Sequence, residues 1–413
     1  MTGAAPICRS RAAGPLVLGL GCALLSCRPP PPDVRGPVVA QIALVSDGGA
    51  TAVVQLEGGA LVTASAPRFQ LFLDSGACAV IEGKLHCRQS IAPDQPLSQE
   101  PALLGGAADR EVRGVAIGRD FACAVMDGGD VRCFGGNDRG QLGAGVRSER
   151  QDLPVTVPGL QGASAIFAGP FTACAVEKDG HVACWGKNDS GENGSSENYL
   201  AAARELVTPE VVRNVSDVTS VAMGLDSTCA VTRTHEVHCW GRSRTEEQIA
   251  QRGDTNELPM RIDAMTGTTF LTANENAFCG VRGGEVVCFG DTSMLIARKD
   301  AAFGTRRGVE KVGITRAKKV SLGANHGCAL TEGGAVYCFG LDSDGALGVP
   351  GKGGYESRSP VKVPELPPAV DIVCGTSASC AITEGRLVFC WGRFSWTSQD
   401  DVHTSPVRAR LAD

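Results

Sequence analysis

The sequence predicts an all-β protein, a seven-bladed β-propeller with four short strands in each blade. Three observations predict this fold. A hairpin bounded by two cysteines recurs seven times in the 413 residues. Successive first cysteines are 45, 51, 55, 50, 49 and 52 residues apart, and a period of about 50 residues made only of short strands is typical of propellers. Each repeat also supplies four strand-like segments, the number in one blade.

The stretch 320–348 shows the repeat most clearly. A strand entry at Val320–Gly323 precedes a hairpin between Cys328 and Cys338, and a Gly-rich loop follows Phe339-Gly340. For the third repeat we expect the strands Pro154–Val157, Ala165–Gly169, Cys174–Glu177 and His181–Trp185. For the fourth we expect Val211–Val212, Val221–Gly224, Cys229–Thr232 and Glu236–Trp240.

The paired cysteines predict one disulfide in each hairpin. Within a pair the cysteines are nine or ten residues apart, so they face each other across adjacent antiparallel strands. Opposed Cα atoms there are about 4.5–5.5 Å apart, a separation that a disulfide tolerates. The expected bridges are Cys78–Cys87, Cys123–Cys133, Cys174–Cys184, Cys229–Cys239, Cys279–Cys288, Cys328–Cys338 and Cys380–Cys390. The alternative is metal ligation, but structural zinc usually takes four ligands from C-x2-C pairs, and the six histidines do not cluster with these cysteines. We expect no metal and no cofactor.

The first 36 residues predict an oxidising compartment, which the disulfides require. Arg9 and Arg11 precede an apolar run too short for a good membrane span. The run ends in Leu24-Leu-Ser-Cys27, which resembles a bacterial lipobox. This resemblance implies a lipoprotein signal peptide at residues 1–26 and lipid attachment at Cys27; the alternative is a plain secretory signal. Residues 27–36 form a Pro-rich tether, and Arg28 after the anchor favours the outer membrane of a diderm cell envelope.

The remaining residues, 37–413, are assigned to the propeller. The segment 37–66 resembles a hairpin without cysteines, and we expect it to be closure or packing material. The alternative is an eighth, degenerate blade. One cysteine, Cys374, is left without a partner, and its place in the repeat predicts a buried core thiol.

Two stretches, Gly323–Leu330 and Cys133–Gly143, resemble the regulator of chromosome condensation repeat family. The likeness covers about residues 69–413 and implies a seven-bladed propeller. The sequence departs from the family pattern, because the repeat histidine survives only as His326 and Gly-Gln-Leu-Gly is intact only at 140–143. The paired cysteines resemble the secreted bacterial branch of the family.

Motifs and charge exclude several functions. We find no phosphate-binding loop that opens a helix, no H-E-x-x-H and no complete EF-hand loop. The formal net charge is −6, and no basic cluster of the kind that nucleic-acid binding needs stands out.

We therefore expect a monomeric, envelope-anchored, non-enzymatic scaffold that binds a protein or a glycan. Recognition is expected in the variable loops after the aromatic-Gly pair, such as 186–194 and 242–248. The alternative is an extracytoplasmic enzyme or enzyme inhibitor on the same scaffold. Guanine-nucleotide exchange on a small GTPase, as in the nuclear relatives, is disfavoured by the inferred compartment.

Overall fold

The computed structural model describes most of the chain from residue 112 to residue 408. Gaps lie at 195–204, 243, 246–247, 249–254, 297–306, 351–355, 385–386 and 394–401. Before residue 112 it describes the backbone of four strands between 39 and 89. The chain divides into two compact units, Met1–Val34 and Arg35–Asp413, and all described strands belong to the second. The expected signal peptide, Cys27 and the tether at 27–36 lie outside the described residues.

Six four-stranded antiparallel sheets repeat one topology, in which each strand pairs with the next along the chain. The first two sheets are β5 (Val112–Ile117), β6 (Phe121–Met126), β7 (Val131–Gly136), β8 (Arg150–Thr156), and β9 (Ala163–Ala168), β10 (Thr172–Glu177), β11 (Val182–Lys187), β12 (Glu205–Val211). The next two are β13 (Val218–Met223), β14 (Ser227–Thr232), β15 (Val237–Arg242), β16 (Thr255–Arg261), and β17 (Thr268–Ala273), β18 (Ala277–Arg282), β19 (Glu285–Gly290), β20 (Arg307–Lys311). The last two are β21 (Ala317–Leu322), β22 (His326–Thr331), β23 (Val336–Leu341), β24 (Glu356–Lys362), and β25 (Ala369–Cys374), β26 (Ala378–Thr383), β27 (Val388–Arg393), β28 (Val402–Arg408).

The grouping of strands differs from the expectation by one position. The strand that contains Pro154 was expected to open the third repeat, but β8 pairs with β7 as the outer strand of the preceding sheet. Likewise Val211 ends β12, which pairs with β11. An outer strand follows the third strand through one loop, so antiparallel pairing with that third strand requires no crossover.

A further sheet has the order β2-β1-β3-β4. Its strands are β1 (Val39–Val45), β2 (Thr51–Gln55), β3 (Gly76–Ile81) and β4 (Lys84–Gln89). The segment 37–66, expected to be closure or packing material, contributes two strands to this sheet, because β1 pairs with β3 of the Cys78–Cys87 hairpin. Among the described strands, β1 and β2 do not form the separate eighth sheet that was the alternative, because they share one sheet with β3 and β4.

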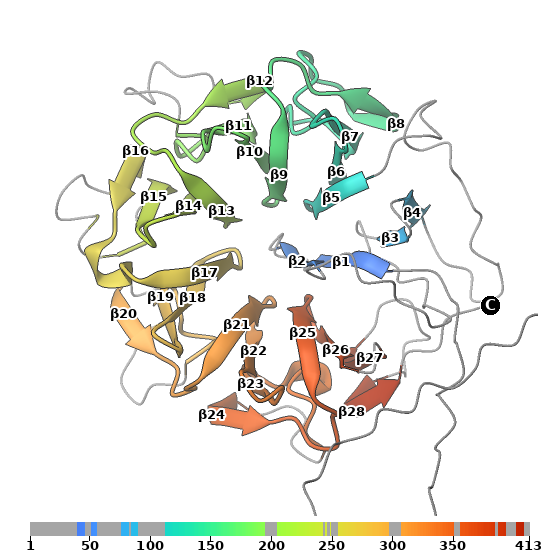
Figure 1. Ribbon diagram of the computed structural model, residues 1–413, viewed down its shortest axis with the longest axis vertical. Helices are drawn as coiled ribbons and strands as arrows, with labels where there is room; N and C mark the ends of the chain where they lie inside the picture. Colours follow the sequence, from blue (N-terminus) through green and yellow to red (C-terminus); the bar gives the residue numbers. More distant parts are fainter. Residues whose placement is uncertain are drawn as a thin grey trace, which may run out of the picture. The chain divides into compact units, whose positions relative to one another are not determined.

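The first strands of consecutive sheets contact one another in the order β5, β9, β13, β17, β21, β25 (Figure 1). Both β5 and β25 also contact β1 and β2. Backbone hydrogen bonds join neighbouring sheets at the hairpin turns: Ala163 N donates to the Gly129 carbonyl and Val218 N to the Gly180 carbonyl, at 2.8 and 3.0 Å. This is the arrangement of a β-propeller, with first strands inside and fourth strands outside.

The core lies between the sheets. Every residue of the second strands β6, β10 and β14 is buried, whereas the outer strand β8 has none buried. Short 3-10 turns lie at η2 (Asp263–Met265) and η3 (Ser343–Gly345). Within the described residues, no helix is long and apolar enough to span a membrane.

Candidate functional site: the loop face

One face of the propeller carries two sets of connections, and we call it the loop face. The first set consists of the tight turns between first and second strands, and the second of the loops that follow third strands. A backbone N–H at the end of each third strand donates to the carbonyl of the adjacent turn. The six donor–acceptor pairs are Gly136–Asp120, Lys187–Phe171, Arg242–Asp226, Asp291–Asn276, Leu341–Asn325 and Arg393–Ser377.

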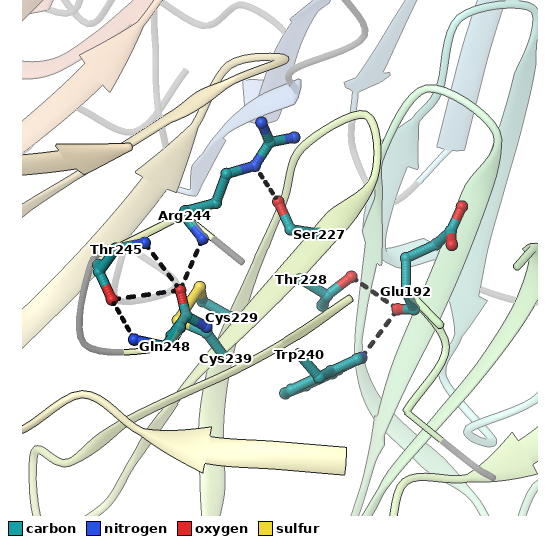
Figure 2. The surroundings of a disulfide bond; sticks show 9 residues. All are labelled: Glu192, Ser227, Thr228, Cys229, Cys239, Trp240, Arg244, Thr245 and Gln248. Carbon is teal, nitrogen blue, oxygen red and sulfur yellow. Dashed lines mark hydrogen bonds between the residues drawn. A yellow bond between two sulfur atoms is a disulfide. The ribbon is translucent and has the colours of Figure 1, made fainter. Parts of the chain in front are cut away.

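The loop after the third strand locks onto the next sheet. In three loops a backbone carbonyl, that of Gln141, Glu192 or Ala346, accepts a hydrogen bond from a buried tryptophan of the following sheet, at 2.9, 2.8 and 2.9 Å. The donors are Trp185, Trp240 and Trp391. Figure 2 shows Trp240 and Thr228 both reaching the Glu192 carbonyl, beside the Cys229–Cys239 bridge.

A glycine closes each of these three loops. Gly194 has φ +66°, and a Cβ built there would lie 2.8 Å from Trp240 Nε1 and 2.9 Å from Val212 Cγ1. Gly143 and Gly348 meet Trp185 and Trp391 in the same way. Only glycine combines this backbone conformation with so close an approach.

These contacts with the next sheet change the interpretation of the loop 186–194, which was expected to carry recognition. Apart from the exposed Asp189 and the half-buried Ser190, every residue of this loop is buried. Asn188 Oδ1 accepts from the Asn193 backbone N–H at 3.0 Å, which holds the loop closed from inside. Residues 186–194 are therefore framework, and the expectation for this loop is wrong.

The second loop that was named, 242–248, is described at four of its seven positions. Arg244 is buried and donates from Nε to Ser227 Oγ at 2.8 Å (Figure 2). Its Nη1 also donates to Asn276 Oδ1 at 3.2 Å. Gln248 Oε1 accepts from the Arg244 backbone N–H at 2.7 Å. This loop also fastens neighbouring sheets to each other.

Exposed polar side chains of the loop face also lie at the tips of the tight turns. Arg119, Asn276 and Asn325 are exposed at three tips, and Asp226, Glu275 and Ser377 are half-buried at the same level. Sequence analysis did not single out these residues. A repeated signal was present, because Gly118, Gly169, Gly224, Gly323 and Gly375 directly follow five of the six described first strands and precede the tips by one or two residues.

A network of alternating charges crosses the loop face. Lys187 Nζ lies 2.8 Å from Glu192 Oε1, 2.9 Å from Asp226 Oδ1 and 3.7 Å from Asp189 Oδ2. Arg242 Nη1 extends the network from Asp226 Oδ2 at 3.7 Å. At the other end, Arg139 Nη1 bridges Asp189 and Glu205 at 3.7 and 3.4 Å, and Arg147 Nη1 joins Glu205 at 3.0 Å. Arg139 Nε also lies 3.9 Å from Asp138 Oδ2, so four bases face five acids and the network carries little net charge.

Burial and charge shift the pKa values within this site. Burial lowers the pKa of Lys187, but Glu192 and Asp226 outweigh it, so the net pKa is raised and the ammonium stays charged. Burial raises the pKa of Glu275, and the Asp226 charge adds to this, while Arg119 and Arg244 oppose it. Charged groups from two other sheets therefore act electrostatically on this carboxyl group.

A buried polar cluster lies between the last two sheets. His326 Nε2 is 2.8 Å from Ser379 Oγ, and burial lowers the pKa of His326 to about 4, so the imidazole is neutral at pH 7. Cys374 is a buried free thiol, as expected, and burial raises its pKa to about 11. A protonated thiol is a poor nucleophile, so this cluster has a structural role.

Six of the seven cysteine pairs are bonded, with S–S distances of 2.02–2.14 Å: Cys123–Cys133, Cys174–Cys184, Cys229–Cys239, Cys279–Cys288, Cys328–Cys338 and Cys380–Cys390. In the seventh pair, Cys78 and Cys87 lie opposite each other in the register of β3 and β4; their side chains lie outside the described residues. Among the described side chains, no group of three His, Cys, Asp or Glu residues is arranged to hold a metal ion.

The opposite face, which we call the hairpin face, has two open grooves at corresponding places. One, of about 940 Å³, is lined by His181, Arg213, Asp217 and Glu236, among others. The other, of about 660 Å³, follows β20 and is lined by Val312, Ile314, Tyr337 and Pro360, among others.

Comparison with known proteins agrees with this architecture. One model of the regulator of chromosome condensation (RCC1) repeat matches residues 112–141, 163–192, 218–245 and 317–346, and a second model of this repeat matches residues 333–382. The chain is 25% identical over 356 residues to the ultraviolet-B receptor UVR8 of Arabidopsis thaliana, covering 79% of this chain and 78% of the receptor. It is 26% identical over 340 residues to the regulator of chromosome condensation of Mus musculus, covering 75% and 79%.

Solved structures show the same fold. Human WBSCR16 aligns with a TM-score of 0.62 at 18% identity, over 73% of this chain and 83% of that one. Prp20p from Saccharomyces cerevisiae aligns at 0.60 and 17% identity, over 73% and 77%. The protein is thus a β-propeller scaffold built from repeated four-stranded sheets. It carries regulator of chromosome condensation (RCC1) repeats between residues 112 and 382.

Proposed function

We propose that the chain is an envelope-anchored lipoprotein whose seven-bladed propeller binds a protein or a glycan through the loop face. The seventh blade in this proposal is the sheet β2-β1-β3-β4. One observation carries the proposed binding role. The backbone bonds beneath the turn tips repeat in six sheets, while the tips carry different side chains, from Arg119 to Glu275 to Asn325. A rigid framework with variable exposed tips is the usual design of a recognition surface.

The proposed partner is polar and carries no strong net charge. The charge network on the loop face sets four bases against five acids, so it offers no field that would attract a polyanion. The exposed tips add an arginine and two asparagine amides, at Arg119, Asn276 and Asn325. Amide and guanidinium groups suit hydrogen bonding to protein backbone or to sugar hydroxyls. The solved relative Prp20p is described with binding properties to Gsp1p and histones, which supports a binding role for such propellers.

The anchor in this proposal rests on the sequence Leu24-Leu-Ser-Cys27 and the prolines that follow it. Several acyl chains on one residue give stable membrane attachment. Metabolic labelling with an alkyne fatty acid should mark the wild-type protein and not Cys27→Ala, and the variant should leave the membrane fraction. Equal labelling of both proteins would contradict the anchor without affecting the loop-face proposal.

Site-specific photo-crosslinking in cells tests the loop face. A photoreactive residue at position 276 or 325 should capture the same discrete partner from either position. Lys178 and Thr234, exposed on the hairpin face, provide matched control positions. Capture of that partner equally well from the control positions would contradict the assignment.

A second candidate is a hydrolytic enzyme, and one observation favours it. Glu275 has a raised pKa and lies within the electrostatic reach of Asp226, and two carboxyl groups in unlike environments are the arrangement of many glycosidases. In this candidate Glu275 is the proton donor. Purified protein would be incubated with envelope glycans, and an activity lost in Glu275→Gln but kept in Glu285→Gln would support it. Absence of any product from the wild-type protein would contradict it.

A further inference from the structure

The outer strands share a proline, with one exception. In each of the six described outer strands that follow a cysteine hairpin, one residue pairs with the second cysteine, for example Val155 with Cys133 and Glu310 with Cys288. The residue just before it is proline in five strands: Pro154, Pro209, Pro259, Pro360 and Pro406. In β20 this position is Val309.

The direction of the backbone N–H groups gives this difference a consequence. Val312 N donates inward to the Val286 carbonyl at 3.0 Å. Because N–H groups alternate along an antiparallel strand, those of Val309 and Lys311 point away from the sheet. A proline at the Val309 position would therefore lose no ladder bond, and it would remove an outward donor. Edge prolines of this kind prevent pairing with another chain, and β20 lacks that protection.

Charge indicates what kind of strand could pair there. The chain from Arg307 to Arg316 contains three basic residues and one acidic residue, in a protein with a net charge of −6. Lys311 pairs with Glu285 at 2.7 Å and Arg316 with Glu332 at 3.2 Å, and all four side chains are exposed. Exposed pairs contribute only about 0–1 kcal/mol, so another carboxylate can replace the acidic partner. Two copies of β20 paired around Val309 would place Arg307 opposite Lys311, which disfavours self-association.

The groove of about 660 Å³ begins where β20 ends, and Val312, Ile314 and Tyr337 line it. A strand added at the edge of β20 would run toward this groove. Strand addition commonly combines main-chain pairing with a pocket for one side chain of the ligand. The unprotected edge of β20, its basic side chains and the groove thus lie at one place in the propeller.

We propose that β20 binds an extended acidic segment of a partner protein by strand addition. The Val309 and Lys311 N–H groups donate to the peptide backbone, basic side chains such as Lys311 pair with its carboxylates, and the groove takes one apolar side chain. This site uses none of the turn tips of the loop face, so it stands or falls separately from the function proposed above.

The test measures amide hydrogen exchange in the full chain with a defined probe. The probe is a synthetic eight-residue peptide that alternates glutamate with valine; the control peptide has lysine in place of glutamate. The glutamate peptide should slow exchange at Val309 and Lys311 at least tenfold at saturation. Val309→Pro should fold, because five other sheets hold proline at this register, and should lose at least tenfold in affinity. Lys311→Glu should also weaken binding, and it keeps the test open if the proline variant fails to fold.

Three results would overturn the proposal. The first is unchanged exchange at Val309 and Lys311 at millimolar glutamate peptide. The second is equal affinity of the wild-type protein and a folded Val309→Pro variant. The third is equal binding of the lysine peptide, which would remove the charge argument. Pro154→Val provides a comparison, since it opens the edge of β8, which lacks the basic residues of β20. This second edge should bind the glutamate peptide more weakly than β20 does.

Discussion

Replacing Gly194 with alanine tests how tightly the loop 186–194 packs against Trp240 of the neighbouring sheet. The backbone there has φ +66°, and the new Cβ would lie 2.8 Å from Trp240 Nε1 and 2.9 Å from Val212 Cγ1. The left-handed conformation costs a non-glycine residue roughly 1–2 kcal/mol. Overpacking against a buried ring adds about 1–3 kcal/mol. We therefore expect Gly194→Ala to lower the free energy of unfolding by about 2–5 kcal/mol.

Gly159 provides a matched control. It has φ +83°, but no atom lies within 4 Å of the position its Cβ would take. Gly159→Ala should therefore show only the backbone cost, about 1–2 kcal/mol. The assay is urea unfolding followed by tryptophan fluorescence, with midpoints compared at constant slope. Equal midpoints for the two variants would refute the claim that the loop 186–194 is held against Trp240.

The remaining predictions concern buried groups. The pKa of His326 is lowered from 6.5 to about 4, so the unfolded state binds more protons between these pH values and stability falls as the pH drops below 6.5. From pH 7 to pH 5 the free energy of unfolding should fall by about 2 kcal/mol. Urea titrations of His326→Gln should lack this pH-dependent loss. Lys319 Nζ lies 2.6 Å from the buried Asp371, so Lys319→Met should lower the free energy of unfolding by about 3 kcal/mol. The control Lys311→Met removes an exposed pair and should lower it by less than about 1 kcal/mol. Equal losses of stability in the two variants would contradict the burial argument. Native protein should not be alkylated by iodoacetamide at Cys374 at pH 8, as mass spectrometry of its peptide will show, because the raised pKa keeps the thiol protonated; rapid labelling would show that the thiol is accessible.

Much of the fold could be predicted from the spacing of cysteines. Opposed residues in a hairpin are fixed by the turn between them, so local sequence determines that Cys174 lies opposite Cys184. The period of about 50 residues then gives a repeat and, with short strands, a propeller. The grouping of strands was missed because the outer strand β8 lies between two sheets in the sequence, and only pairing in space assigns it to β7.

The role of the loops could not be predicted from their variability. The loop 186–194 is rich in polar residues, which suggests a solvent-exposed segment. Its Asn193 and Glu192 side chains are instead completely buried, because Asn193 donates to the carbonyls of Gly186 and Lys187. Burial of polar side chains that hydrogen-bond to the backbone leaves no trace in composition. The buried pair of Lys319 and Asp371 joins residues 52 positions apart, and no local pattern marks it.

The most direct test of the central claim is the affinity of the crosslinked partner for purified variants of the propeller. One variant combines Arg119→Ala, Asn276→Ala and Asn325→Ala on the loop face, and the control combines Lys178→Ala, Arg233→Ala and Thr234→Ala on the hairpin face. We expect the loop-face variant to lose at least tenfold in affinity, with the control within twofold of wild type. Unchanged affinity in the loop-face variant, or a larger loss in the control, would contradict recognition through the loop face.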